Sequence, residues 1–270
     1  MLVGEYNMAD GMSFDKYIDN PAGGSTVVTN RKMYKDMYKS KFDAVLLREQ
    51  GKIKYFVYHD TDIHDSYYIH MKIPSEVIDN FYYDVVIRLY TTIGSKKSAT
   101  SLRAYAVQFY SNDPAFVYTF AYSFSKNKLF INDLSSKMSK TALSTRATVK
   151  NPHNDVWYVK SLYFAYLAME RYNLFNRTVL DKASKKYSKR VLLGNIDNAD
   201  KKIHERQEAA KKKTLEEKKE KKKVERNINV SSTTTKKAVT SKMSTSSKTT
   251  KKVPTTKTSK TTTMHKPKNK

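Results

Sequence analysis

Imidazole and carboxylate side chains are concentrated between positions 59 and 65, in the run His59-Asp60-Thr61-Asp62-Ile63-His64-Asp65, with His70 close behind. Such groups bind Zn²⁺, Mn²⁺ or Fe²⁺ and can activate water for hydrolysis. The candidate metal ligands are His59, Asp62 and His64. The spacing is not that of an HExxH motif, and no distant His or Asp motif of matching character follows. Because Asp and Thr also stabilise tight turns, we expect a polar turn between two strands, with a metal-dependent enzyme acting on nucleic acid as the alternative.

Other catalytic signatures are absent from the sequence. The chain has no Cys, which excludes disulfides, thiolate metal sites and a cysteine nucleophile. The run Gly94-Ser95-Lys96-Lys97-Ser98 lacks the first Gly and the spacing of a phosphate-binding P-loop. No GxSxG motif and no kinase-type HRD motif is present. We therefore expect a protein without enzymatic activity and without a cofactor.

Positive charge is concentrated at the C-terminal end. Residues 201–270 hold 23 Lys and Arg against 6 Glu, in a chain of formal net charge +25. Spaced lysines neutralise phosphates with release of counterions, so they bind nucleic acid without sequence preference and with strong salt dependence. The predicted contact residues are the clustered lysines Lys211, Lys212, Lys213, Lys218, Lys219, Lys221, Lys222, Lys223, Lys236, Lys237, Lys251, Lys252, Lys257 and Lys260.

Other interpretations of the charge stay open. DNA is the partner that we favour, and the composition does not distinguish a DNA-binding from an RNA-binding protein. A tail that only increases solubility has the same composition. The loop at 94–103, with Lys96, Lys97 and Arg103, could extend a basic face together with Lys126 and Lys128.

The longest apolar run, Asn154–Phe175, holds the single Trp of the chain and predicts the central helix. Its residues Val156, Val159, Tyr163 and Tyr166 recur at helical spacing. Asn154 and Asp155 are of the type that caps a helix N-terminus. A membrane span needs about 18 or more uninterrupted apolar residues, whereas the mainly apolar part of this run, Val156–Met169, is shorter and contains Lys160. We therefore predict a buried helix and no membrane span.

Strands are predicted upstream of this helix. Residues 42–49 and 53–59 flank a Gln50-Gly51 turn in the manner of a β-hairpin, and β-branched and aromatic residues favour strands at 66–73, 84–92 and 101–111. Residues 116–124 alternate with period two, which favours a strand over a helix, whereas 132–143 predicts a short helix. The predicted fold is α+β: a mainly antiparallel sheet of five or six strands, followed by two packed helices that cover one face.

The C-terminal half of the sequence predicts three further segments. Residues 177–193 form an amphipathic pattern typical of a second packed helix. Residues 201–226 are strong helix formers with Glu208 and Glu217 four positions before Lys212 and Lys221, which predicts a solvated basic helix. Of the 40 residues in 231–270, 20 are Ser or Thr and 11 are Lys, so this tail is predicted to be disordered. The predicted boundaries are a weakly structured segment 1–40, a folded domain 41–194, a basic helix 195–230 and a tail 231–270.

Two stretches, NDPAFVYTFAYSFSKNKLFI (112–131) and NPHNDVWYVKSLYFAYLAMERYNLF (151–175), resemble uncharacterised structural proteins of tailed bacteriophages that infect low-GC Gram-positive hosts. The bias toward Lys, Asn, Ile and Tyr agrees with an AT-rich genome. The resemblance contains no catalytic or ligand motif. It implies a virion or assembly component with other structural proteins as partners, located near packaged DNA in the virion or in the host cytoplasm. The N-terminal sequence has no basic region followed by an apolar run, so no secretory signal is expected.

Overall fold

The computed structural model describes most of the chain. The described residues are 12–19, 31–62, 65–92, 101–152, 154, 156 and 159–239. For 19, 31–34 and 226–239 the backbone alone is described. The chain divides into two units, Met1–Leu215 and Glu216–Lys270.

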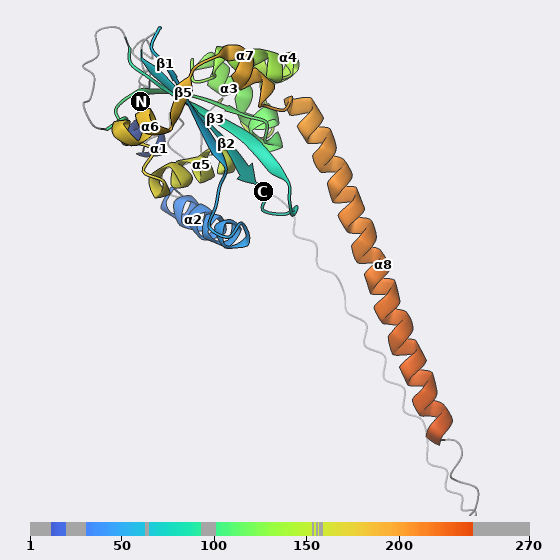
Figure 1. Ribbon diagram of the computed structural model, residues 1–270. Helices are drawn as coiled ribbons and strands as arrows, with labels where there is room; N and C mark the ends of the chain where they lie inside the picture. The colour runs from blue at the N-terminus through green and yellow to red at the C-terminus, as the bar shows by residue number, and fades with distance from the viewer. Residues whose placement is uncertain are drawn as a thin grey trace, which may run out of the picture. The chain divides into compact units, whose positions relative to one another are not determined.

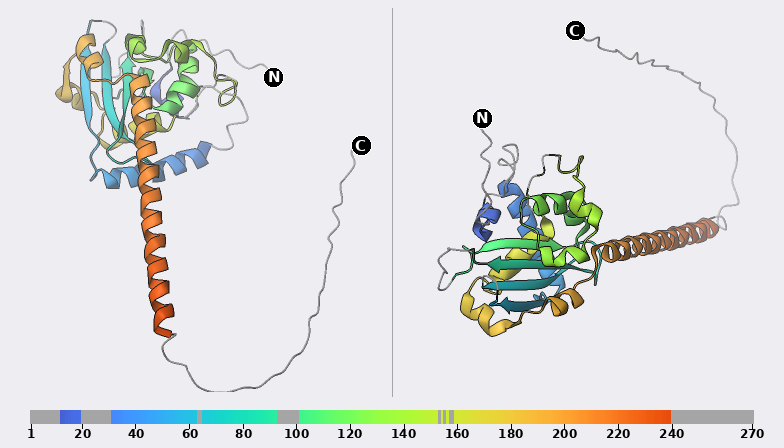
Figure 2. Two further views of the ribbon diagram at one scale, coloured as in Figure 1. Left: turned by 90° about the vertical axis from the view of Figure 1, so that its right-hand side faces the viewer. Right: turned by 90° about the horizontal axis from the view of Figure 1, so that it is seen from above.

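A five-stranded sheet organises the first unit, in the order β4-β3-β2-β1-β5 (Figure 1). β1 (Tyr55–Asp60), β2 (Ser66–Pro74), β3 (Tyr82–Tyr90) and β4 (Ala106–Ser111) pair antiparallel, and the right-hand view of Figure 2 shows them side by side. β5 (Ser184–Lys186) pairs parallel with β1 at one edge. The α+β fold with a mainly antiparallel sheet, predicted from the sequence, is confirmed.

Helical segments cover both faces of the sheet, not one face as predicted. On the first face, the Ser111 Oγ of β4 lies 3.3 Å from the Ser161 Oγ of α5 (Lys160–Arg171). On the opposite face, the Tyr68 hydroxyl of β2 donates to Asp133 in the 3₁₀ helix η4 (Asn132–Lys137), against which α7 (Lys189–Gly194) packs. Figure 1 shows α5 and α7 on opposite sides of the strands. Side chains on both faces of the sheet are therefore buried, as expected when a sheet forms the middle layer between two layers of helical segments.

The first two helices belong to the core. α1 (Phe14–Asp19) buries Phe14, Tyr17 and Ile18, and the Phe14 ring lies 5.7 Å from that of Phe109 on β4. α2 (Arg31–Arg48) places the Phe42 ring 5.5 Å from that of Phe164 on α5. Folded structure therefore extends N-terminal to the predicted boundary at residue 41. Residues 1–11 and 20–30 of the predicted weak segment lie outside the described residues.

The predicted strand at 42–49 is wrong, because these residues end helix α2. Phe42, Val45 and Leu46 are buried at helical spacing, whereas Leu47 is exposed. Gln50 and Gly51 have φ angles of 52° and 76°. A left-handed conformation is the usual end of a helix, so the expected turn at this dipeptide is a helix terminus and not a hairpin.

The predicted strand at 116–124 is also wrong. Residues Phe116–Phe120 form the π-helical turn η3, which continues as α3 (Ala121–Lys126). The ring centroids of Phe116 and Phe124 lie 5.2 Å apart, so the aromatic residues pack together on a helical surface. The short helix expected at 132–143 is replaced by η4 and by α4 (Lys140–Ser144).

The predicted central helix is present as α5, and seven of its residues are buried. It begins later than expected. Its N-cap position is Val159, which makes no side-chain capping bond, and Asn154 has a φ of 57° in the preceding segment. Asp155 and Trp157 lie outside the described residues. No helix in the described part of the chain is both long enough and apolar enough to cross a membrane.

The predicted helix at 177–193 is interrupted. α6 (Arg177–Ala183) is followed by strand β5 and then by α7, which ends at Gly194. The backbone N–H of Tyr187 donates to the carbonyl of His59 on β1 at 2.9 Å. Pairing with β1 satisfies backbone groups that a continuous helix would have satisfied internally.

The long helix α8 (Ala199–Val239) begins against the β2–β3 connection within the first unit. Ala199 and Ile203 are buried, and Ala209 packs on a small cluster of Ile78, Phe81 and Tyr83. The predicted basic helix is thus present. Its helical backbone continues to Val239, past the predicted boundary at residue 230, and 240–270 lie outside the described residues.

Candidate nucleic-acid interface and the predicted metal cluster

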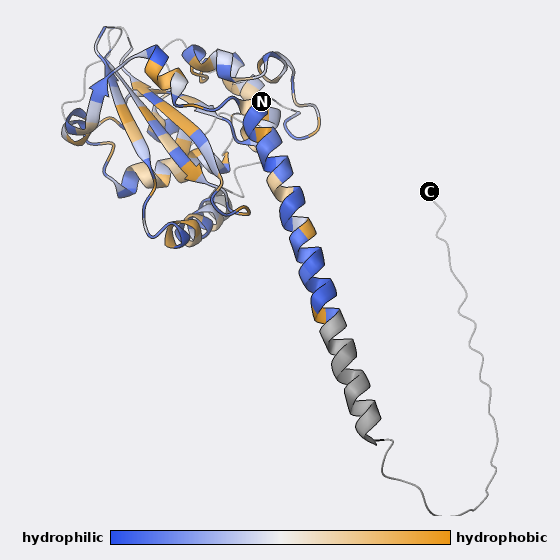
Figure 3. Ribbon diagram, turned by 45° about the vertical axis from the view of Figure 1, so that its right-hand side comes forward, coloured by the Kyte–Doolittle hydropathy of each residue, from blue (hydrophilic) through white to orange (hydrophobic). Residues whose placement is uncertain are grey.

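Helix α8 carries the described part of the predicted nucleic-acid interface. Figure 3 shows it hydrophilic along almost all of its coloured length. Every residue from Lys211 to Glu225 is exposed. Within the first unit, Lys211 and Lys212 form no hydrogen bond or ion pair with any described residue, whereas Lys213 donates to the Val77 carbonyl at 2.9 Å. Lys213 is therefore partly used in holding the helix on the β2–β3 connection.

In the second unit, the charges of α8 segregate around the helix axis. Successive residues of an α-helix are rotated by about 100°, which places Lys218, Lys219, Lys222 and Lys223 within an arc of about 140°. Glu217 and Glu220 fall outside this arc, whereas Glu216 and Glu225 border it, about 20° from Lys223 and Lys218 respectively. The four lysines form no ion pair with any described residue. We call these four residues the α8 lysine stripe. Such a stripe can meet a row of phosphates while the acidic side faces water.

The expected ion pairs along α8 do not form. Glu208 pairs with His204, 3.3 Å from its Nε2, and not with Lys212. No ion pair joins Glu217 and Lys221. Lys212 and Lys221 are therefore not paired along the helix, whereas Lys201 and Lys202 near its start both pair with Glu205.

The remaining predicted contact lysines fall outside the described side chains. Lys236 and Lys237 lie on α8, where only the backbone is described. Lys251, Lys252, Lys257 and Lys260 lie outside the described residues.

At the β1–β2 connection, where the sequence predicts a polar turn with a metal site as the alternative, the structure contains an ion-pair network. His59 Nε2 lies 2.7 Å from Oδ1 of Asp65, and Asp65 also pairs with the Arg177 guanidinium at the start of α6. Arg177 Nη1 donates to the Tyr105 hydroxyl at 3.2 Å. The expected polar turn therefore exists, but it is tied to a helix more than a hundred residues later in the sequence.

Asp181 completes this network from the next turn of α6. It accepts a hydrogen bond of 2.6 Å from the Tyr67 hydroxyl, and its Oδ1 lies 3.9 Å from His59 Nδ1. The rings of His59 and Tyr67 stack with centroids 4.2 Å apart. Burial and the bond to Asp181 raise the pKa of Tyr67 well above its ordinary value. Tyr67 therefore stays protonated and keeps donating to Asp181 at physiological pH.

The network accounts for His59 without a metal. Within the described part of the chain, no three His, Cys, Asp or Glu side chains are grouped in a way that could hold a metal ion. Asp62 is exposed, and its backbone N–H donates to Asp60 Oδ1 in a turn. His64 lies outside the described residues. Arg177 supplies the charge that neutralises Asp65, which is the task a bound cation would otherwise perform.

His70 belongs to a second polar network, in which His70 and Asp84 are fully buried and Lys72 is partly exposed. Its Nε2 lies 2.7 Å from Oδ1 of Asp84, and both side chains have 0% exposure. Lys72 Nζ lies 2.5 Å from the same oxygen, and Asn112 donates to the other carboxylate oxygen at 2.9 Å. Burial alone would raise the pKa of Asp84, but the hydrogen bonds from His70 and Lys72 lower it. This group links β2, β3 and the end of β4, and its location indicates a structural role.

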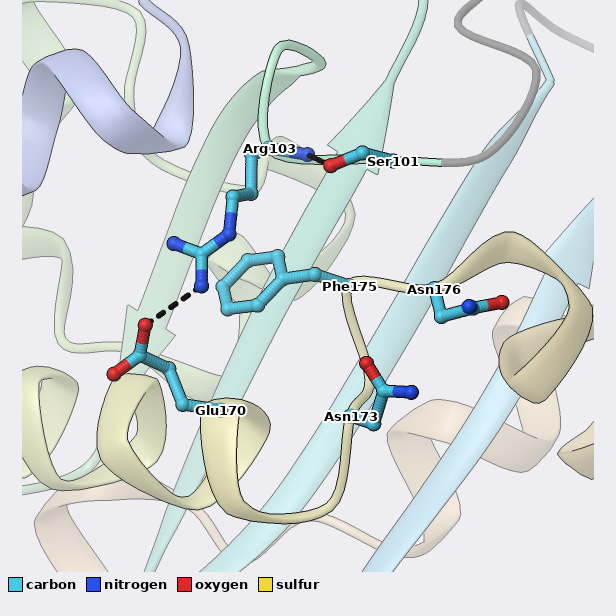
Figure 4. Close-up of a pocket in the computed structure, with 6 residues that line it drawn as sticks. All are labelled: Ser101, Arg103, Glu170, Asn173, Phe175 and Asn176. Carbon is cyan, nitrogen blue, oxygen red and sulfur yellow. Dashed lines mark hydrogen bonds and ion pairs between the residues drawn. The ribbon is translucent and has the colours of Figure 1, made fainter.

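A shallow pocket of about 260 Å³ lies beside the first network, on the segment that joins α5 to α6. It is lined by Ser101, Arg103, Glu170, Asn173, Phe175 and Asn176 (Figure 4). The Arg103 guanidinium lies 4.4 Å from the Phe175 ring centroid and 2.6 Å from a Glu170 oxygen. Arg103 is therefore neutralised within the protein and is not a free contact for phosphate.

Sequence reasoning missed Asp65, Arg177 and Asp181 as a group, because they come from separate elements that only the fold brings together. It also placed Lys126 and Lys128 in a basic face with Arg103. Lys126 lies 5.6 Å from the Tyr122 ring centroid, and Lys128 has a φ of 57° in the turn after α3. Lys96 and Lys97 lie outside the described residues.

Comparison of the chain with protein-family models, with curated proteins and with solved structures found no match.

Proposed function

We propose that this is a non-enzymatic structural or assembly protein of the tailed-phage type, whose basic C-terminal arm binds nucleic acid nonspecifically through phosphates. The observation that carries the proposal is the α8 lysine stripe, whose four side chains are exposed and without a partner among the described residues. Six Glu accompany the 23 Lys and Arg of residues 201–270, so the whole arm attracts polyanions.

The structural half of the proposal is supported by the resemblance of 112–131 and 151–175 to phage structural proteins. In the fold these stretches supply η3, α3 and α5, which are core elements. A likeness in core elements concerns the folded unit, which would dock with other structural proteins in a virion or in the host cytoplasm. DNA is the nucleic acid that a virion component of this kind would meet.

DNA binding measured over a series of salt concentrations tests the proposed binding of nucleic acid by the C-terminal arm. Binding of the full chain to duplex DNA should weaken steeply with salt, since the logarithm of affinity falls by about 0.9 per phosphate contact and per decade of salt. Replacement of Lys218, Lys219, Lys222 and Lys223 by Gln should reduce this slope by about 3 to 4. Replacement of the same residues by Arg should preserve it, because the charge is retained.

The matched control replaces four exposed lysines outside the arm, Lys39, Lys52, Lys140 and Lys150, by Gln. Its net charge changes by the same amount, so an effect of overall charge alone would lower both slopes equally. Equal slopes for the control and the α8 variant would contradict the proposal. A Gln variant that binds RNA and DNA with the same residual slope would show that the stripe does not discriminate between the two.

A further inference from the structure

A second group of unpaired cations lies on the folded unit, at the β5 edge of the sheet. The side chains of Lys182, Lys185, Lys186 and Arg190 are exposed and form no hydrogen bond or ion pair with any described residue. They fall within nine consecutive positions. We call these four residues the β5 cation cluster. The sequence alone predicts the polar side of a continuous helix here. The fold instead places Lys182 near the end of α6, Lys185 and Lys186 on β5, and Arg190 in the first turn of α7.

The acidic residues near this cluster are already engaged. Asp181 accepts a hydrogen bond from Tyr67 and pairs with Arg177 at 4.0 Å. Asp133 accepts hydrogen bonds from Tyr68 and Tyr187 and pairs with Lys189 at 3.2 Å. Lys189 balances Asp133, whereas Asp181 keeps its negative charge, because Arg177 already balances Asp65 and Tyr67 is neutral. One carboxylate charge against four cations still leaves a local excess of positive charge at this edge.

The two edges of the sheet differ. The outer side of β4 is bridged by Phe130 and by Ser13, with Phe109 donating to the Leu129 carbonyl at 2.7 Å. No described segment pairs with the outer side of β5. Since Tyr187 N–H points toward β1, strand alternation directs the N–H of Lys186 away from it. Outward backbone N–H groups beside lysines are typical phosphate contacts.

We infer that the β5 cation cluster is a second contact surface for the phosphate backbone of nucleic acid, located on the folded unit and separate in sequence from the C-terminal arm. The inference rests on the proposed function, because it assumes the same class of partner. Successive strand side chains point to opposite faces, so Lys185 and Lys186 flank the edge on both sides. Lys182 and Arg190 extend the charge onto the adjoining ends of α6 and α7. A phosphodiester chain that runs along the edge would meet all four.

Protection of the edge is the competing explanation, because lysines on edge strands prevent pairing with a second chain. β5 has only three residues and its length alone makes it a poor template for pairing. Four unpaired cations, two of them outside the strand, exceed what edge protection requires. The two explanations differ in what happens when the charge is removed.

The test uses the full chain and duplex DNA in a salt series. Replacement of Lys182, Lys185, Lys186 and Arg190 by Gln should lower the salt slope by about 3 to 4, as should the α8 variant, while the Lys39, Lys52, Lys140 and Lys150 variant keeps its slope. The combined β5 and α8 variant should lose about twice as much, because the two surfaces contact different phosphates. Lysine acetylation footprinting should show Lys185 and Lys186 protected by DNA in the unmodified protein.

Each outcome separates the inference from the proposed function. A β5 variant with the slope of the control overturns the inference, and an unaltered effect of the α8 variant then leaves the proposed function intact. A reduced slope for the β5 variant beside an unchanged α8 variant supports the inference and contradicts the role of the arm. Self-association of the β5 variant in sedimentation, with an unchanged slope, assigns the cluster to edge protection and overturns the inference.

Discussion

The His59 imidazole lies between two carboxylates, with Nε2 2.7 Å from Asp65 Oδ1 and Nδ1 3.9 Å from Asp181 Oδ1. Both ring nitrogens therefore face acidic groups of the protein itself. A metal ligand needs a free nitrogen lone pair, and a general base needs one aimed at a substrate. The arrangement instead joins the β1–β2 connection to α6 through charge, and Arg177 balances Asp65 in the same network.

Removal of Arg177 should destabilise the protein. Arg177→Gln leaves Asp65, whose side chain is 9% exposed, without its cation. Loss of one partner of a largely buried pair costs about 2 to 4 kcal/mol in the free energy of unfolding. Urea denaturation followed by circular dichroism measures this cost. The control is Arg190→Gln, which removes an exposed guanidinium without a described partner and should change the free energy by less than about 0.5 kcal/mol. A similar loss for both variants would show that the Asp65 pair is not the cause.

The buried Asp84 should be even more sensitive. Asp84→Asn removes the charge that faces His70 and Lys72, with the His70 and Asp84 side chains both at 0% exposure. The expected loss is about 3 to 5 kcal/mol in the free energy of unfolding. Asp79→Asn is the control, because Asp79 is 73% exposed in a surface pair with Arg48 and should cost about 0 to 1 kcal/mol. Equal costs would indicate that the buried network contributes no more than a surface pair.

Stability should fall in acid, because of the same carboxylate. Burial alone would raise the pKa of Asp84, but His70 and Lys72 lower it, so the folded state binds this proton less readily than the unfolded state does. The stabilisation is therefore present above the ordinary carboxyl pKa of about 3.9 and is lost as the pH falls below it. An NMR titration of the Asp84 carboxyl carbon should give a midpoint below about 3.9. A midpoint above this value would mean that desolvation outweighs the two hydrogen bonds.

Substitution of glycine by alanine should destabilise the protein at Gly51 and stabilise it at Gly194. Gly51 has a φ of 76° at the end of α2, and an added Cβ would lie 3.8 Å from Arg171 Nη2, which is ordinary contact. Gly51→Ala should therefore cost about 1 kcal/mol, through backbone strain alone. At Gly194, the last residue of α7, an added Cβ meets no atom within 4 Å. Gly194→Ala should stabilise by about 0.5 to 1 kcal/mol, since it reduces the entropy of the unfolded chain. Thermal denaturation of both variants checks the contrast, which destabilisation by Gly194→Ala would refute.

The central strands and the helices α5 and α8 could be predicted from local patterns in the sequence. The β-branched and aromatic residues of β3 and the helical spacing along α5 are properties of short windows. The density of Lys and Glu in α8 likewise favours a solvated helix. The location of unpaired positive charge on the arm was also determined by the sequence, because charge does not depend on folding.

Tertiary contacts determined the conformation of those segments whose local sequence pattern fits either a helix or a strand. Residues 42–49 end a helix because Phe42 packs on Phe164 of α5, and residues 184–186 leave the helical pattern because the edge of β1 offers them backbone partners. The His59 network likewise depends on Arg177 and Asp181, which reach the β1–β2 connection only when α6 packs against β1. Contacts between residues distant in sequence carry no local signal. Only the folded structure therefore shows that the polar turn expected at 59–65 belongs to an ion-pair network, and that the predicted helix face at 177–193 includes a basic sheet edge.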